Sequence, residues 1–188
     1  ASDVYKRQRY GWVVELDALN PLYIPVKRTA IGRIARAGLL ATQSKDGRPV
    51  LFFTQDAAAG MLFRFVAATN ATDGTALDSG MLSVAVLGGD GIDWVALPND
   101  VPTLAGLANA GATAGGESFD APAGLALSQD GGALYMACAG NAQRSVADSL
   151  NPGGGEGHIV RFTLPGGDAT ARHFPATLAL VAGNPAVR

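Results

Sequence analysis

Three pairs of short apolar runs, each joined by a glycine-containing turn, constrain the fold of this chain more than any other feature. The pairs are residues 39–42 with 50–53, 81–87 with 94–97, and 125–127 with 133–138. Asp-Gly stands in the first and third turns, as Asp46-Gly47 and Asp130-Gly131. Because glycine reaches the positive φ that a tight turn needs, each pair predicts an antiparallel hairpin.

Further apolar runs predict single strands between and after the hairpins, at residues 9–17, 61–67, 158–164 and 169–174. Helical spacing allows a short amphipathic helix at 27–37 and another within the connecting loop, at 103–110. Strand pairs that recur at intervals of some tens of residues are typical of repeated β-blades. The pattern predicts an all-β fold, a partial β-propeller of roughly three blades of antiparallel strands, with a β-sandwich as the alternative.

The composition describes one globular domain and excludes several partners. Residues 1–8 fit nothing that follows and are interpreted as a non-native scar of cloning or sequence assembly, which leaves 9–188 as the domain. With 16% charged residues and a net charge of −2, the chain has no basic footprint for nucleic acid. No apolar run is long enough for a transmembrane helix. The single cysteine, Cys138, lies in an apolar run and is expected to be buried and inert.

Polar residues gather between the runs at 133–138 and 158–164, where a long loop is a favoured place for function. The candidates are Asn141, Arg144, Asn151 and His158. A second candidate is the basic cluster around Arg28, which could hold a phosphate or be an ordinary solvated loop face. No serine lies in a Gly-x-Ser-x-Gly motif, so a hydrolase triad with either histidine is disfavoured.

Several phrases, in this order, resemble the PhoX-type alkaline phosphatases over about residues 9–162: GWVVELD, VKRTAIGR, LFRFV, the Leu-Asp-x-Gly-x-Leu of 77–82, LYMACAGN and NPGGGEGHIVRF. The resemblance implies a β-propeller that is periplasmic or secreted and hydrolyses small phosphate monoesters. It also implies a central site with iron and calcium. Because the likeness spans only part of such a protein, the remaining blades of a longer chain are expected partners.

The residues that match the family's metal ligands differ from the family pattern. Arg36-Ala37-Gly38 stands where relatives carry His-Glu-Gly, and Ala121-Pro122-Ala123 stands where they carry Arg-Pro-Glu. In place of Gly-Asp-Asp the chain has Thr54-Gln55-Asp56, so Asp56 is the one matching carboxylate that remains. Calcium takes six to eight oxygen ligands, and iron likewise prefers hard anionic donors.

Two hypotheses therefore stand side by side, and no residue can be named as catalytic. The first is a phosphomonoesterase that uses iron and calcium, as the resemblance implies. The second is a degenerate propeller that retains no metal and serves as a binding or structural module. Family likeness favours the first, whereas Ala37 and Ala123 favour the second.

Overall fold

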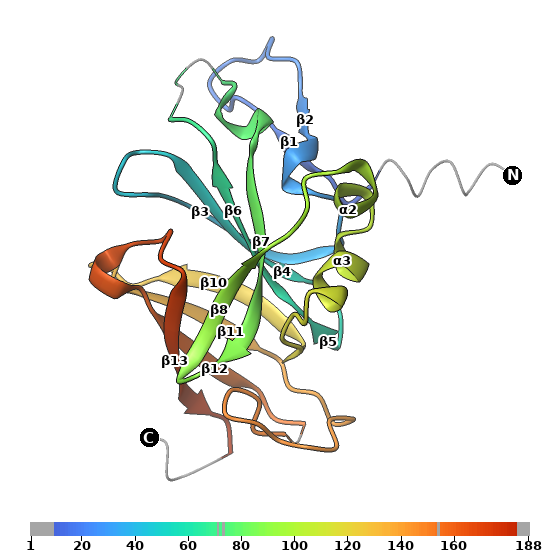
Figure 1. Ribbon diagram of the computed structural model, residues 1–188, viewed down its shortest axis with the longest axis vertical. Helices are drawn as coiled ribbons and strands as arrows, with labels where there is room; N and C mark the ends of the chain where they lie inside the picture. Colours follow the sequence, from blue (N-terminus) through green and yellow to red (C-terminus); the bar gives the residue numbers. More distant parts are fainter. Residues whose placement is uncertain (1–9, 71, 73, 154, 184–188) are drawn as a thin grey trace, which may run out of the picture.

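The structure, a computed structural model, describes residues 10–70, 72, 74–153 and 155–183, so the expected scar at 1–8 lies outside the described residues. Strands dominate the described part, with two short α-helices and three 3-10 turns (Figure 1). The strands are β1 (Val13–Glu15), β2 (Val26–Arg28), β3 (Arg36–Gln43), β4 (Pro49–Gln55), β5 (Ala59–Gly60), β6 (Leu62–Ala67), β7 (Gly80–Gly88), β8 (Gly91–Ala96), β9 (Phe119–Asp120), β10 (Pro122–Leu127), β11 (Ala133–Cys138), β12 (His158–Thr163) and β13 (His173–Val181). The helices are α2 (Val101–Ala105) and α3 (Leu107–Thr113), and the 3-10 turns are η1 (Thr29–Ile31), η2 (Ala76–Asp78) and η3 (Pro165–Gly167).

Nine strands form one antiparallel sheet in the order β10-β11-β12-β13-β8-β7-β6-β4-β3. Two short ribbons, β1–β2 and β5–β9, stand apart from it. The two edge strands of this sheet are β10 and β3, and they lie against each other, because β10 also contacts β3 and β4. The sheet is therefore nearly closed on itself. The strands belong to a continuous sheet, so the expected number of roughly three blades stays a prediction.

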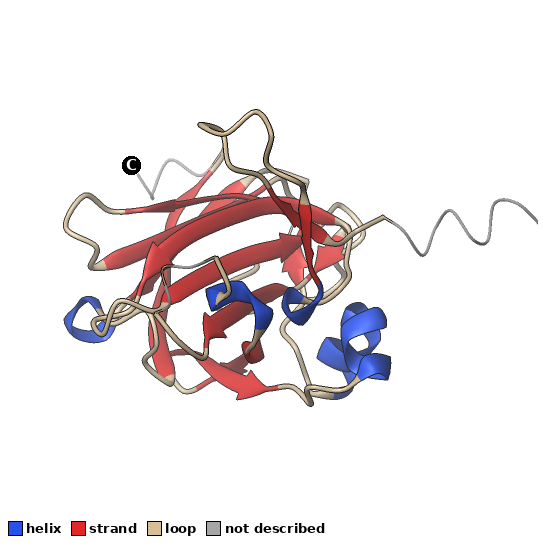
Figure 2. Cartoon of the chain, turned by 90° about the horizontal axis from the view of Figure 1, so that it is seen from above, coloured by secondary structure: helices blue, strands red, loops and turns tan. Residues whose placement is uncertain are grey.

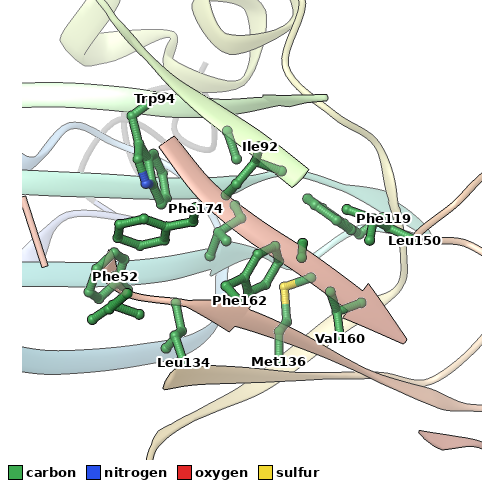
Figure 3. Packing of buried hydrophobic residues seen from close by; sticks show 14 of the residues in the cluster. Phe52, Ile92, Trp94, Phe119, Leu134, Met136, Leu150, Val160, Phe162 and Phe174 are labelled. Carbon is green, nitrogen blue, oxygen red and sulfur yellow. The ribbon is translucent and has the colours of Figure 1, made fainter. Parts of the chain in front are cut away.

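The middle of the sheet separates two hydrophobic cores. Phe52 and Phe53, neighbours on β4, point to opposite faces because side chains alternate along a strand. Phe52 packs with Trp94 and Phe174 in the first core, which strands β11, β12 and β13 complete (Figure 3). Phe53 packs in the second core beneath η1 and α3. Strands that are covered on both faces have mostly apolar sequences without alternation, and β6 is buried along its whole length, with Arg64 as its one polar residue.

One buried cation interrupts this apolar interior. Arg64 on β6 donates from Nη1 to the carbonyl oxygens of Ala169 and Ala171, at 3.0 and 2.8 Å. Its guanidinium also lies 4.6 Å from the centre of the Trp94 ring. Desolvation lowers the pKa of Arg64 to about 10. The side chain therefore ties β6 to the segment before β13 while remaining charged at neutral pH.

The three expected hairpins are confirmed, as β3–β4, β7–β8 and β10–β11. Strands expected at 61–67 and 158–164 are confirmed as β6 and β12. Of the strand expected at 9–17, the described part forms only Val13–Glu15.

Three other expectations were wrong in kind or extent. Residues 27–37 form no helix but the end of β2 and the turn η1, because Gly32 takes a φ of +78° that ends helical geometry. The helix expected at 103–110 is two helices, α2 and α3, which Gly106 separates. The last strand begins at His173, not 169, because Asp168 Oδ1 accepts from the backbone N–H of Thr170 and shapes a turn there.

The helices α2 and α3 lie together at one flank of the strands (Figure 2). Asp100 caps α2 by accepting a hydrogen bond from the backbone N–H of Thr103, at 2.8 Å. Leu107 at the start of α3 is buried in the second core. Within the described residues, no helix has the length and apolar character needed to cross a membrane.

We expect Gly91→Ala to destabilise the protein by about 1–3 kcal/mol, the usual cost of overpacking. Gly91 lies opposite Pro175 where β8 pairs with β13, and a Cβ atom there would lie 2.1 Å from the carbonyl oxygen of Phe174. Gly124→Ala on β10 is the control, since no atom lies within 4 Å of its added Cβ. Urea unfolding of both variants tests this, and equal stabilities would contradict it.

Candidate functional site

The loop between β11 and β12 is organised by Arg144. Its Nε donates to Asp120 Oδ1, its Nη2 to the carbonyl oxygen of Ser118, and its Nη1 to Asp148 Oδ2 at 3.3 Å. Asp120 is fully buried at the end of β9. The guanidinium is thus occupied on all three nitrogens, and it neutralises a carboxylate that has no access to solvent.

Asn151 ties the other end of the same loop to this ion pair. Its Nδ2 donates to Glu117 Oε1 at 3.0 Å and to Asp148 Oδ2 at 2.9 Å, while its Oδ1 accepts from the backbone N–H of Asp120 at 3.2 Å. Burial of Glu117 raises its pKa, and the nearby Asp148 carboxylate adds to this. We call Arg144, Asp120, Asp148, Asn151 and Glu117 the polar network.

His158 lies beside the polar network as the first residue of β12, opposite Cys138 on β11. Both side chains are buried, as expected for the cysteine. Neither ring nitrogen of His158 makes a hydrogen bond of good geometry within the described residues, although the Leu150 backbone lies close enough to favour the protonated ring and so to raise its pKa. Desolvation lowers the pKa of His158, although the Asp120 and Asp148 carboxylates act in the opposite direction. At neutral pH the imidazole is therefore uncharged.

Asn141 lies at the rim of a depression of about 300 Å³ whose wall includes Arg144. Asn141 Oδ1 accepts from the backbone N–H of Gln143 at 3.1 Å, and its carbonyl oxygen accepts from the backbone N–H of Arg144 at 3.0 Å. The remaining lining residues are Ala59, Ser118, Gln143, Ser145 and Val146. Asn141 thus shapes the turn that presents Arg144.

The structure therefore brings Arg144, Asn151 and His158 together, with Asn141 at the rim. It also adds Asp120, Asp148 and Glu117, which sequence reasoning missed as members of a site. The i,i+4 spacing of Arg144 and Asp148 was the one local signal for them. Asp120 and Glu117 lie more than twenty residues away in sequence, so only the fold reveals their role.

Arg28 is not part of this group. It is neither a phosphate ligand nor a solvated loop residue, the two alternatives that the sequence left open. Its side chain is buried, with Nε 2.5 Å from Glu15 Oε2 and Nη1 2.5 Å from Asp78 Oδ1. Nη2 donates to the carbonyl oxygen of Gly74. Glu15, the last residue of β1, is half-buried and holds this arginine.

The positions expected to match metal ligands meet elsewhere, where β3 approaches β10. Thr54 Oγ1 on β4 accepts from the backbone N–H of Gly38 at 2.9 Å and donates to the carbonyl oxygen of Ala123 at 2.8 Å. A Cβ atom on Gly38 would lie 2.2 Å from that carbonyl oxygen. Ala37 and Asp56 are exposed next to this contact, and the Asp56 backbone N–H donates to the carbonyl oxygen of Ala35 at 2.9 Å.

These residues do not make a metal centre by themselves. Across the described ranges, no three His, Cys, Asp or Glu side chains are grouped so that they could hold a metal ion. At the β3–β10 contact the available oxygens are one hydroxyl, backbone carbonyls and the Asp56 carboxylate, which falls short of the charged ligand set that calcium or iron prefers. The carboxylates of the polar network are already engaged by Arg144 and Asn151.

We expect Arg144→Leu to destabilise the protein by about 3–5 kcal/mol, because it leaves the buried Asp120 carboxylate without its cation. The double variant Arg144→Leu/Asp120→Asn removes both charges and should recover much of that loss. Urea unfolding of the two variants and the wild type provides the comparison. Exposed ion pairs contribute less than about 1 kcal/mol to the free energy of unfolding, so a loss of that size for Arg144→Leu would contradict a buried ion pair.

The two histidines should give the stability opposite dependences on pH. The lowered pKa of His158 means that its contribution is present above its unfolded-state pKa of 6.5 and is lost as the pH falls toward the folded-state value. A hydrogen bond to Asp90 raises the pKa of His173, so its contribution is present below pH 6.5 and is lost as the pH rises through the folded-state value. His158→Leu should therefore lessen the loss of stability from about pH 7.5 to about pH 5.

Thermal unfolding across that range checks this, with His173→Gln as the matched control. The control should steepen the loss of stability toward acid, because it removes the opposing contribution. A His158→Leu variant that keeps the wild-type pH profile would show that His158 is not held neutral by burial.

Comparisons with known proteins place this chain in a family. A family model described as alkaline phosphatase PhoX matches residues 2–188. The fold is similar to a solved PhoX from Pseudomonas fluorescens in complex with vanadate, a transition state analogue, with a TM-score of 0.86 and 27% sequence identity. A comparison with proteins of curated function gave no match.

That alignment covers 97% of this chain and 37% of the Pseudomonas chain, so the chain spans little more than a third of that relative. The likeness confirms the expected β-propeller over the alternative sandwich, since the strands superpose on those of a PhoX structure. It also confirms the resemblance in the phrases from Gly11 to Phe162. The chain belongs to the PhoX alkaline phosphatase family.

Proposed function

We propose that this chain is a scaffold segment of a PhoX-type propeller whose own residues no longer build the metal centre of a phosphatase. One observation carries the proposal. The strands that bear Ala37 and Ala123 are held side by side through Thr54, yet both positions have a methyl group where the family resemblance implies a carboxylate. The two strands lie side by side, and the charge that would attract a cation is missing.

In relatives the cations would polarise the phosphate ester and stabilise the charge that develops as the phosphoryl group is transferred. The residues present do not fit such ions, because Asp56 alone cannot replace a cage of several carboxylates. The polar network does not compensate for this, since each of its carboxylates already receives hydrogen bonds from Arg144 or Asn151. Its role in this proposal is to fix the loop between β11 and β12.

The second candidate is an active hydrolase of small phosphate monoesters, periplasmic or secreted, that uses iron and calcium. Membership of the PhoX family favours it. It requires that the missing carboxylates come from outside this chain, which spans 37% of the Pseudomonas protein. Asp56, exposed near the β3–β10 contact, would then contribute one ligand among several.

Metal analysis and an aryl phosphate assay separate the two candidates. The scaffold proposal expects the product of the full gene, which would include any carboxylates from outside this chain, to bind neither iron nor calcium in stoichiometric amount and to show no turnover when both are added. Bound metal together with turnover would overturn it and establish the hydrolase.

Restoring the two carboxylates should restore cation binding. We expect Ala37→Glu/Ala123→Glu to gain calcium affinity, because it returns two anionic oxygen ligands to strands that are already adjacent. Calcium at ten times its Kd would stabilise the variant by about 1.4 kcal/mol, or roughly 3–6 °C in Tm. Thermal unfolding with and without calcium measures this.

The control is Ala41→Glu/Ala126→Glu, which places the same charges at exposed positions on the same two strands, β3 and β10. It should show no shift with calcium. If the Ala37/Ala123 variant responds no more than the control, the two positions do not form a ligand site.

A further inference from the structure

A cavity of about 470 Å³ lies where the junction of α2 and α3 approaches the segment that leads into β3. One wall is formed by residues 105–109 and another by residues 33–35, and Tyr10, Gly11 and Gln55 complete the lining. The cavity shares no lining residue with the depression beside the polar network. Pockets of this size, with a mainly apolar lining and a few polar groups, are the usual binding sites of small organic molecules.

The walls of this cavity are joined by hydrogen bonds, so its shape is set in the folded chain. The backbone N–H of Arg33 donates to the carbonyl oxygen of Leu104 at 2.7 Å. The Arg33 side chain donates from Nε to the carbonyl oxygen of Tyr10 at 3.0 Å, and from Nη1 to that of Ala105 at 3.4 Å. A site that is ordered before binding loses less conformational entropy when a ligand enters.

The charge around the cavity is positive. Arg33 is part of the lining, and no Asp or Glu side chain of the described residues lines the cavity. Arg36 lies behind the wall, where its Nη1 donates to the carbonyl oxygens of Gly11 and Ile34 at 2.6 and 3.1 Å. Its Nε is buried and has no hydrogen-bond partner in the described part of the chain. Desolvation lowers the pKa of Arg36 to about 10, which keeps it charged at neutral pH, so the cavity favours an anionic ligand.

The rest of the lining fits an apolar body. Ile34 and Leu107 are buried apolar side chains of the second core that reach the cavity. Gln55 and Asn109 add two amide groups. Gln55 Oε1 accepts from the backbone N–H of Met61 at 3.3 Å, so its Nε2 is the end that can donate to a ligand.

We propose that this cavity binds a small organic carboxylate, with the anionic group at Arg33 and the apolar body against Ile34 and Leu107. One cation in the lining matches the single negative charge that a carboxylate carries at neutral pH. An inorganic anion would leave the apolar lining without contacts, and an uncharged molecule would leave the arginines without a counter-charge. The site goes beyond the proposed scaffold role and does not depend on it.

Calorimetric titration of the product of the full gene with 2-naphthoate tests the proposal. The matched probe is 2-naphthamide, which has nearly the same shape and no charge. We expect the acid to bind at least about tenfold more tightly than the amide, because hydrogen bonds to charged groups are roughly twice as strong as neutral ones.

Two variants locate the binding. Ala105→Trp should abolish it, because the indole would fill the cavity at an exposed position that needs no repacking of the core. Arg33→Gln should weaken the binding of 2-naphthoate by about tenfold and leave that of 2-naphthamide unchanged. Ala112→Trp, at an exposed position of α3 outside the lining, is the control and should bind both probes as the wild type does.

Equal affinities for the acid and the amide would overturn the proposal. So would binding that Ala105→Trp leaves intact, since the probe would then lie elsewhere, for example on a metal ion. A wild-type protein that binds no 2-naphthoate at millimolar concentration would overturn it as well. Should Arg33→Gln fail to fold, the Ala105→Trp variant and the comparison of the two probes still decide. None of these readouts depends on phosphatase activity.

Discussion

Thr54 Oγ1 holds β3 and β10 together at a point where Gly38 on β3 has no room for a side chain. This contact brings the two edges of the nine-stranded sheet together, and the interior then fills with the aromatic side chains of Figure 3. It also sets Ala37 and Ala123 near each other. The same contact thus closes the fold and lies beside the two positions where we propose that carboxylate ligands are missing.

Local features of the chain could be predicted from sequence, because they depend on a few neighbouring residues. The hairpins follow from glycine at the turns, and β6 from a run that is apolar except for Arg64. The helix expected at 27–37 failed because a single glycine, Gly32, adopts a conformation that periodicity does not encode. The predicted start of β13 was wrong for a similar reason, since a hydrogen bond that the Asp168 side chain accepts shapes the turn before the strand.

The candidate site shows the same division between local and distant causes. Arg144, Asn151 and His158 could be chosen from sequence as polar residues in one loop, and the fold does bring them together. Their partners Asp120 and Glu117 come from a different segment, so no spacing rule could find them. Arg28 was misjudged because an arginine in a basic run looks solvated until its carboxylates, Glu15 and Asp78, are placed.

Ala121 has a φ of 51°, a left-handed conformation that costs an alanine about 1 kcal/mol. Both backbone polar groups of Ala121 are hydrogen-bonded. Its N–H donates to the carbonyl oxygen of Ala58, and its carbonyl oxygen accepts from the backbone N–H of Ala139. The left-handed conformation of Ala121 is thus fixed by backbone hydrogen bonds and not by its side chain. Since neither hydrogen bond involves the side chain, a larger residue at position 121 would keep the same backbone conformation, and its side chain would leave the backbone in the direction of the present Ala121 Cβ.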